Sequence, residues 1–149
     1  MKKVIIINGP NLNMLGKREI DIYGRESLKD IENKCKNLSD SLNFKLTFFQ
    51  SNSESEIIDK IHATSKNYSA LIINAGAFTH TSVAIHDSLK ILSCPIIEVH
   101  LSNLSKREKF RQKSLITPLA SGSISGFGHQ VYNIALYSLK LIWSDNENK

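Results

Sequence analysis

Short apolar runs stand out along this chain against longer segments of mixed polarity. The run Val4 to Ile7 is uninterrupted and β-branched, which is typical of a parallel strand buried on both faces. Ala70 to Ile73 is also apolar throughout, Phe44 to Phe49 alternates, and Pro95 to Val99 forms a further run. Together with a short strand expected within 117–125, these runs predict five strands.

The segments between these strands carry apolar residues at helical spacing. Ser27 is a typical N-cap with Asp30 in the first turn, and the inner face of the helix that follows is expected at Leu28, Ile31, Cys35, Leu38 and Leu42. A second helix is expected to start at 51–54. Three more are expected from Thr79 or Thr81 to Ile91, near Lys106 to Phe110, and from Gly126 to about Trp143, with a frayed tail at 144–149.

Alternating strands and helices predict an α/β fold with a parallel sheet and helices on both of its faces. Five strands suit the flavodoxin-like, doubly wound strand order 2-1-3-4-5. No repeat, low-complexity segment or linker interrupts the chain, so we expect residues 1–149 to form one domain.

The composition favours a soluble domain over a membrane protein or a secreted protein. Hydrophobic residues make up 41% and charged residues 22%, as in ordinary soluble domains. No apolar run approaches the ~20 residues of a membrane helix. The first run is cut short by Asn8-Gly9-Pro10, unlike the apolar region of a signal peptide. We therefore expect a cytoplasmic protein that does not bind membranes.

The net charge of +5 raises the question of a nucleic-acid partner. The lysines are scattered, and the densest run, residues 106–109, contains a glutamate. Most of the excess positive charge is therefore explained by lysines and arginines on solvent-exposed helix faces. A site for an anionic small molecule is the next best explanation, and no nucleic-acid partner is expected. The cysteines and histidines show no metal-ligand spacing, and no phosphate-binding glycine motif is present, so we expect no metal or organic cofactor.

Candidate chemistry gathers at the carboxyl ends of three expected strands. Polar residues follow the first strand at Asn8, Asn11, Asn13, Arg18 and Tyr23, the third at Asn74 and His80, and the fourth at Glu98, His100, Ser102, Asn103 and Arg111. These strands are neighbours in the order 2-1-3-4-5, and ligands of such sheets bind beyond the carboxyl ends. One shared crevice is therefore predicted.

Glu98 and His100 are two residues apart on a strand, so both can face this crevice, with the imidazole as a proton donor or acceptor. A guanidinium at Arg18 would favour the phenolate of Tyr23. Each group also has an ordinary structural explanation: a strand-end pair can merely satisfy its own hydrogen bonds, and a tyrosine can anchor a loop.

Five sequence blocks taken together resemble the type II 3-dehydroquinate dehydratases in order and spacing over essentially the whole chain. The blocks are Ile7-Asn8-Gly9-Pro10-Asn11-Leu12-Asn13 with the Arg18 and Tyr23 segment, Gln50-Ser51-Asn52-Ser53-Glu54, Asn74-Ala75-Gly76-Ala77-Phe78-Thr79-His80-Thr81-Ser82, Ile97-Glu98-Val99-His100-Leu101-Ser102-Asn103 with residues 107–111, and the glycine-rich stretch 122–128.

This resemblance implies a single catalytic domain and the reversible trans-dehydration of 3-dehydroquinate to 3-dehydroshikimate through an enolate, the third step of the shikimate pathway. It also implies a homo-oligomer, a dodecamer built from trimers. The implied catalytic residues are Tyr23 as base, Arg18 as its activator, Asn11 at the enolate, and His100 as acid supported by Glu98. The implied substrate-binding residues are Leu101 and Ser102 at the carboxylate, Asn74, His80 and Arg111 at the hydroxyls, and Asp87 from a neighbouring subunit.

Three other interpretations stay open at this point. The chain can be a nucleotide- or flavin-binding module of the same fold, because fold alone does not fix function. It can be an oligomeric scaffold whose polar strand ends are structural. It can also be a lyase acting on a related hydroxy acid.

Overall fold

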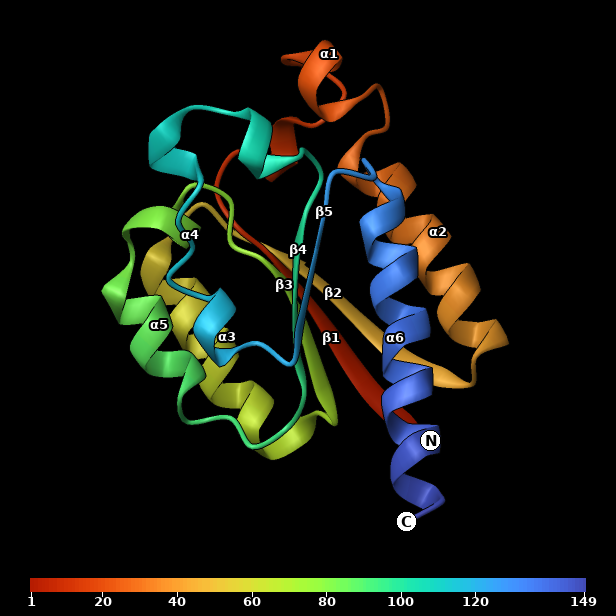
Figure 1. Cartoon of the computed structure of the whole chain (residues 1–149). Coiled ribbons are helices and arrows are strands. Elements are labelled where there is room, and N and C mark those ends of the chain that lie inside the picture. Colours follow the sequence, from red (N-terminus) through yellow and green to blue (C-terminus); the bar gives the residue numbers. More distant parts are fainter.

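A parallel sheet of five strands forms the centre of the molecule (Figure 1), for which a computed structural model describes all residues from 1 to 149. The strands lie in the order β2-β1-β3-β4-β5, which confirms the predicted flavodoxin-like fold class. Their bounds are β1 Lys2–Asn8, β2 Phe44–Gln50, β3 Ala70–Asn74, β4 Ile96–His100 and β5 Gly122–Ser125.

Helices cover both faces of the sheet. On one face lie α2 (Leu28–Ser41) and α6 (Gln130–Glu147), side by side in Figure 1, and on the other lie α3 (Glu54–Asn67) and α5 (Val83–Leu89). The shorter helices α1 (Ile20–Tyr23) and α4 (Phe78–Thr81) lie with the loops at the carboxyl ends of the strands. No helix, α6 included, combines the length and the apolar composition that a membrane span requires.

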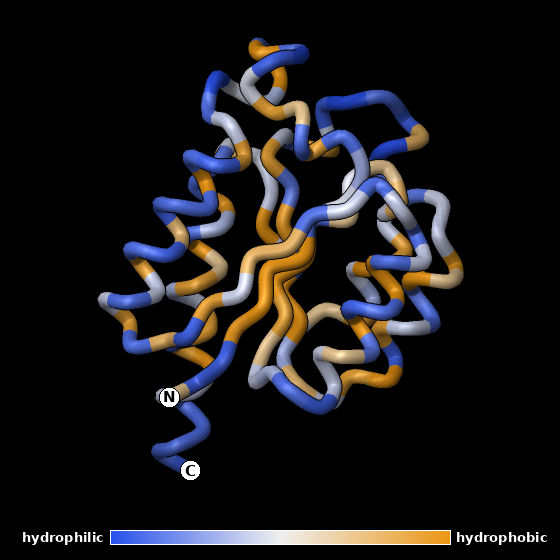
Figure 2. Tube along the Cα trace, turned by 180° about the vertical axis from the view of Figure 1, so that it is seen from behind, coloured by the Kyte–Doolittle hydropathy of each residue, from blue (hydrophilic) through white to orange (hydrophobic).

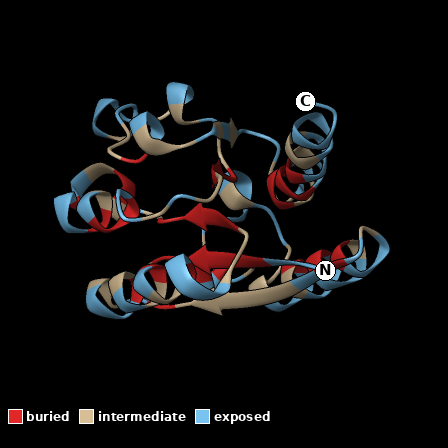
Figure 3. Cartoon of the chain, turned by 90° about the horizontal axis from the view of Figure 1, so that it is seen from below, coloured by how far each residue is buried: buried red, intermediate tan, exposed pale blue.

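The interior strand β1 shows why the sequence folds into three layers. Val4 and Ile6 pack into the core beneath α2 and α6, whereas Ile5 and Ile7 pack beneath α3 and α5, and all four are fully buried. Burying such a side chain contributes roughly 1.5–3 kcal/mol. The apolar strands between polar outer helix surfaces are visible in Figure 2, and the buried centre in Figure 3.

Several helix boundaries follow local chemistry. The predicted cap of α2 is confirmed: Ser27 Oγ accepts from the Asp30 amide at 3.1 Å, and Asp30 Oδ2 accepts from the Ser27 amide at 3.0 Å. The single helix expected up to Ile91 was wrong. Ser82 adopts an extended conformation and caps α5 by accepting from the Ile85 amide, so the segment divides into α4 and α5.

Two further predictions about helices need correction. The short helix expected at 106–110 is a pair of 3₁₀ turns, Leu104–Lys106 and Lys109–Arg111. Helix α6 continues to Glu147 rather than ending near Trp143, because residues 144–147 contain no glycine or proline that would end it. Residues 144–147 are therefore helical.

Candidate active site

A cavity of about 120 Å³ lies at the carboxyl ends of β1, β3 and β4. This is the crevice predicted from the strand order. Most of the predicted site residues line it, namely Asn11, Arg18, Tyr23, Asn74, His80, His100, Leu101, Ser102 and Arg111. Glu98 lies behind His100, and Asp87 lies outside the cavity on α5, with its carboxylate 3.9 Å from Lys90 Nζ.

The back wall of the cavity is a buried ion-pair network at the end of β4. His100 Nε2 lies 2.7 Å from Glu98 Oε2, as expected for two residues on the same face of a strand. The Glu98 side chain is 1% exposed, and it also accepts hydrogen bonds from Ser114 Oγ at 2.6 Å and Thr117 Oγ1 at 2.5 Å. Sequence reasoning missed Ser114 and Thr117.

Burial alone would raise the pKa of Glu98. Hydrogen bonds from His100, Ser114 and Thr117 outweigh this desolvation and hold the pKa below its ordinary value of 4.5. Glu98 is therefore a carboxylate at neutral pH, and its negative charge faces the His100 ring. Because Nε2 of His100 faces Glu98, Nδ1 is the ring atom available for proton transfer.

The imidazole of His80 lies beside that of His100. The ring centroids are 6.5 Å apart and the planes differ by 22°. His80 Nδ1 donates to the Lys113 carbonyl at 2.7 Å, which leaves Nε2 as a hydrogen-bond acceptor in the neutral ring. His80 can therefore accept a hydrogen bond from a substrate hydroxyl.

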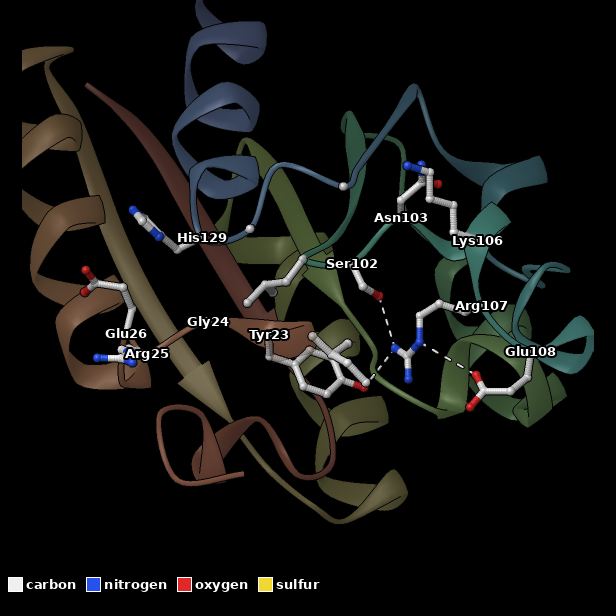
Figure 4. A pocket seen from close by; sticks show the side chains of 14 residues that line it. Tyr23, Gly24, Arg25, Glu26, Ser102, Asn103, Lys106, Arg107, Glu108 and His129 are labelled. Atoms are coloured by element: carbon white, nitrogen blue, oxygen red, sulfur yellow. Dashed lines mark hydrogen bonds and ion pairs between the residues drawn. The ribbon is translucent and has the colours of Figure 1, made fainter. Parts of the chain in front are cut away.

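The front of the cavity is formed by the long loop after β1. Arg107 Nη1 donates to Tyr23 Oη at 2.9 Å and to Ser102 Oγ at 3.1 Å, and Figure 4 shows these three side chains converging. The Arg18 guanidinium lies over the Tyr23 ring, 4.8 Å from its centroid, and pairs with Glu19 at 2.6 Å. The hydrogen bond to the phenol oxygen thus comes from Arg107, although the sequence had suggested Arg18 alone.

Sequence reasoning missed Arg107 because the run 106–109 was interpreted as solvated. Its side chain is only 11% exposed, since it reaches back into the space between Tyr23 and Ser102. On the outer side of Tyr23 the surface opens into a groove of about 840 Å³, drawn in Figure 4.

The loop that carries Tyr23 is weakly anchored. Helix α1 contains no buried residue, and Ile20 and Ile22 are each about two-fifths exposed, at 42% and 41%. Glu19 adopts a left-handed conformation with φ of 41°, which costs a non-glycine residue roughly 1–2 kcal/mol. Both features favour a loop that can change conformation.

A buried clamp ties together the ends of β1 and β3. Tyr132, from α6, is fully buried; its hydroxyl donates to Asn8 Oδ1 at 2.6 Å and accepts from Asn74 Nδ2 at 3.1 Å. Burial raises the pKa of Tyr132, so its hydroxyl stays neutral. The clamp fixes the Asn74 amide, which lines the cavity. Tyr132 gave no signal in the sequence because a tyrosine on the inner face of a helix is ordinary core.

The end of β2 supports the loop after β1, although the crevice was predicted from the ends of β1, β3 and β4 alone. Asn52 Oδ1 accepts from the Asn11 amide at 3.0 Å and from Gln50 Nε2 at 3.1 Å. Asn11 itself is left-handed, with φ of 68°, which asparagine tolerates better than most residues. Gly9 is required for close approach, because a Cβ there would lie 2.4 Å from the Ala75 carbonyl oxygen.

Other reactive groups do not form a second centre. No cluster of three or more His, Cys, Asp or Glu side chains could hold a metal ion. The two cysteines are free, and burial raises the pKa of both, that of Cys35 to about 12. The site can therefore be described from its phenol, imidazole, amide and guanidinium groups.

Known proteins resemble this chain over most of its length. The family model for dehydroquinase class II matches residues 2–140. The 3-dehydroquinate dehydratase of Caldicellulosiruptor bescii is 55% identical over 143 residues, covering 95% of this chain and 99% of that protein. The 3-dehydroquinate dehydratase 1 of Agrobacterium fabrum is 50% identical over 139 residues, covering 93% and 96%.

Solved structures agree with the sequence matches. The crystal structure of the type II dehydroquinase from Butyrivibrio crossotus superposes with a TM-score of 0.92 at 42% identity, covering 93% of this chain and 97% of that chain. A 3-dehydroquinate dehydratase-like protein from Bifidobacterium longum is more distant, with a TM-score of 0.74 at 27% identity and coverage of 97% and 99%.

Proposed function

The chain belongs to the class II dehydroquinase family, and we propose that Tyr23 and His100 are the base and the acid with which it dehydrates 3-dehydroquinate to 3-dehydroshikimate. It is a hydro-lyase of type II, acting in the shikimate pathway. This membership favours the dehydratase over a nucleotide-binding module or a scaffold.

The first step removes a proton from the C2 carbon, next to the ketone. A Tyr23 phenolate accepts this proton, and the guanidinium of Arg107, which donates to the phenol oxygen, stabilises the phenolate. Arg18 adds positive charge over the ring. The electron pair left at C2 moves onto the ketone oxygen and forms an enolate, whose oxygen Asn11 stabilises.

The second step expels the C1 hydroxyl. The enolate electrons return to form the C1–C2 double bond, and the C1–O bond breaks as His100 donates the proton from Nδ1, so that water leaves. Glu98 holds the other ring nitrogen, Nε2, and so fixes the orientation of the imidazole during this transfer. Tyr23 then holds one proton more and His100 one fewer, and exchange with solvent restores both.

The remaining cavity residues bind substrate in this proposal. The backbone amides at Leu101 and Ser102 with the Ser102 hydroxyl receive the carboxylate, and Arg107 beside Ser102 adds charge that the sequence had not assigned. Asn74, His80 and Arg111 bind the ring hydroxyls. These residues supply hydrogen-bond donors and acceptors on three sides of one small cavity.

One observation carries the assignment of base and acid. Tyr23 and His100 line the same cavity, and each contacts a charged group: the Arg107 guanidinium donates to the phenol oxygen, and the Glu98 carboxylate faces the imidazole. Phenolate and imidazolium together are the pair that a stepwise elimination next to a ketone needs.

The test follows the ultraviolet absorbance of the conjugated product with purified protein and 3-dehydroquinate. Tyr23→Phe should lower kcat by about 10²- to 10⁴-fold, the usual contribution of a positioned base. Tyr68→Phe is the matched control, because its hydroxyl bonds only Thr47, away from the cavity, and it should keep the wild-type rate. A Tyr23→Phe variant as fast as this control would remove Tyr23 from the mechanism. A folded wild type that forms no product would refute the activity itself.

We also propose that twelve copies assemble from trimers, in the cytoplasm, and that Asp87 reaches a neighbour's cavity. Asp87 lies outside its own cavity on α5, next to the exposed apolar residues Val83 and Ile91. An apolar surface beside an exposed acid is suited to a subunit contact. Light scattering after size exclusion should give twelve times the subunit mass of 16.7 kDa, and a monomer mass would contradict the proposal.

A further inference from the structure

A short segment, residues 113–117, closes the back of the acid side of the site and ends at the first residue of a 3₁₀ turn, Thr117–Leu119. Ser114 Oγ and Thr117 Oγ1 each donate to a different oxygen of Glu98, at 2.6 Å and 2.5 Å. His100 Nε2 occupies the same Oε2 atom as Ser114. Together, these three donors engage both oxygens of a carboxylate that is nearly free of contact with solvent.

This segment is built so that the Ser114 hydroxyl has one direction in which to donate. Ser114 Oγ accepts from the backbone amides of Ile116 at 3.0 Å and Thr117 at 3.1 Å, which uses its lone pairs. Its single hydrogen therefore points to Glu98. A serine hydroxyl oriented by the backbone is a fixed donor rather than a rotating one.

The same segment holds the second histidine of the cavity. The Lys113 carbonyl accepts from His80 Nδ1 at 2.7 Å, and the Leu115 amide donates to the Thr79 carbonyl at 2.9 Å, which ties the segment to α4. His80 and His100 therefore take their orientations from one short segment.

We propose that Ser114 and Thr117 are positioning residues for the general acid His100 and act on it through Glu98. The inference rests on the proposed function, in which His100 Nδ1 protonates the departing hydroxyl. With both oxygens engaged, Glu98 cannot rotate about its terminal bond without losing a hydrogen bond. It therefore holds His100 with the Nε2 proton on Glu98 and Nδ1 toward the substrate.

Loss of the two hydroxyls should misalign the acid without removing it. In the Ser114→Ala/Thr117→Val double variant, kcat should fall about 10- to 100-fold, as small misplacements of a catalytic group do. KM should change by less than about twofold, because the side chains of Ser114 and Thr117 do not line the substrate cavity. Thr117→Ser restores a hydroxyl at one Glu98 oxygen and should recover most of the loss that Thr117→Val causes.

Thr64→Val is the matched control for loss of a buried hydroxyl. Thr64 is fully buried on α3, and its Oγ1 donates to the Lys60 carbonyl. Thr64 neither lines the cavity nor bonds Glu98 or His100. It should keep the wild-type kcat. Since Thr117 lies at the surface, Thr117→Val alone tests the inference if the double variant does not fold.

A spectroscopic measurement separates this inference from the proposed function. NMR of protein labelled with ¹⁵N at histidine reports which ring nitrogen of neutral His100 carries the proton. The wild type should show the proton on Nε2, and the double variant should show a mixture of both forms. If the wild type showed no dehydratase activity, the proposed function would be refuted, but the position of the His100 ring proton could still be measured in both proteins. Unchanged ring signals, or a kcat no lower than that of Thr64→Val, would overturn the positioning role.

Discussion

The two sides of the cavity are constructed in opposite ways. On the acid side, His100 and Glu98 end an interior strand, are buried, and have hydrogen-bond partners from a distant segment. On the base side, Tyr23 is partly buried at the end of a four-residue helix that has no fully buried residue and that follows a residue in a left-handed conformation. Arg107 provides the only hydrogen bond to its phenol oxygen.

The acid side is therefore suited to holding its groups in a fixed position, and the base side to letting substrate enter the cavity. Groups on a strand with buried partners lose little entropy when substrate binds, because they are already ordered. A base on a weakly packed loop must be ordered in each cycle, and the same loop can open the cavity. Substitutions on the acid side should therefore change kcat alone, whereas those on the base side should change kcat and KM together.

Among three further substitutions that test this comparison, the largest effect is expected on the acid side. His100→Ala removes the proton donor from a wall that stays otherwise ordered, so kcat should fall about 10³-fold with little change in KM. Steady-state kinetics with 3-dehydroquinate measure both constants. A rate within tenfold of wild type would assign the acid role to another group and would end the contrast between the two sides.

An intermediate effect is expected at Arg107. Arg107 Nη1 donates to both Tyr23 Oη and Ser102 Oγ, and the planar guanidinium that carries it has its orientation fixed. Lysine keeps the charge but places a compact, strongly hydrated ammonium on a shorter, flexible side chain. Arg107→Lys should lower kcat/KM about 10- to 100-fold, through both constants. Arg25→Lys in the outer groove provides the control and should match wild type. A change confined to kcat would show that the base side is as preorganised as the acid side.

The smallest effect is expected in the pH dependence of the free energy of unfolding, from which the contribution of Glu98 can be separated. Hydrogen bonds hold its folded-state pKa below 4.5 despite the desolvation that opposes them. The stability that this provides is complete above pH 4.5 and is lost as pH falls through the folded-state pKa. Glu98→Gln lacks this component, so urea unfolding should show the wild type losing more stability than the variant from pH 6 to pH 3. Parallel losses would show that Glu98 is not stabilised as a carboxylate.

The sheet could be predicted because its strands are encoded locally. Val4 to Ile7 and Ala70 to Ile73 are apolar on both faces, and that pattern requires a central position in a parallel sheet. The contact between Glu98 and His100 also follows from a spacing of two on a strand. Such features depend on near neighbours in the chain, which periodicity captures.

The contacts that complete the site could not be predicted in the same way. Arg107 and Tyr23 are 84 positions apart. Ser114 lies in irregular chain and Thr117 begins a three-residue 3₁₀ turn, where no periodicity in the sequence indicates the direction of a side chain. The break at Ser82 was missed because a serine can either continue a helix or cap the next one. Each of these outcomes depends on the three-dimensional path of a loop rather than on the composition around the residue.

The clamp of Tyr132 has a consequence for biosynthesis of the protein. Every residue proposed to bind or act on substrate precedes position 112, yet the hydroxyl that joins the ends of β1 and β3 belongs to α6, at the end of the chain. Translation proceeds from the amino end, so a ribosome-bound chain carries all of the reactive side chains before it can make this clamp. Synthesis of the last helix should therefore set the moment at which a nascent chain becomes competent to bind its substrate.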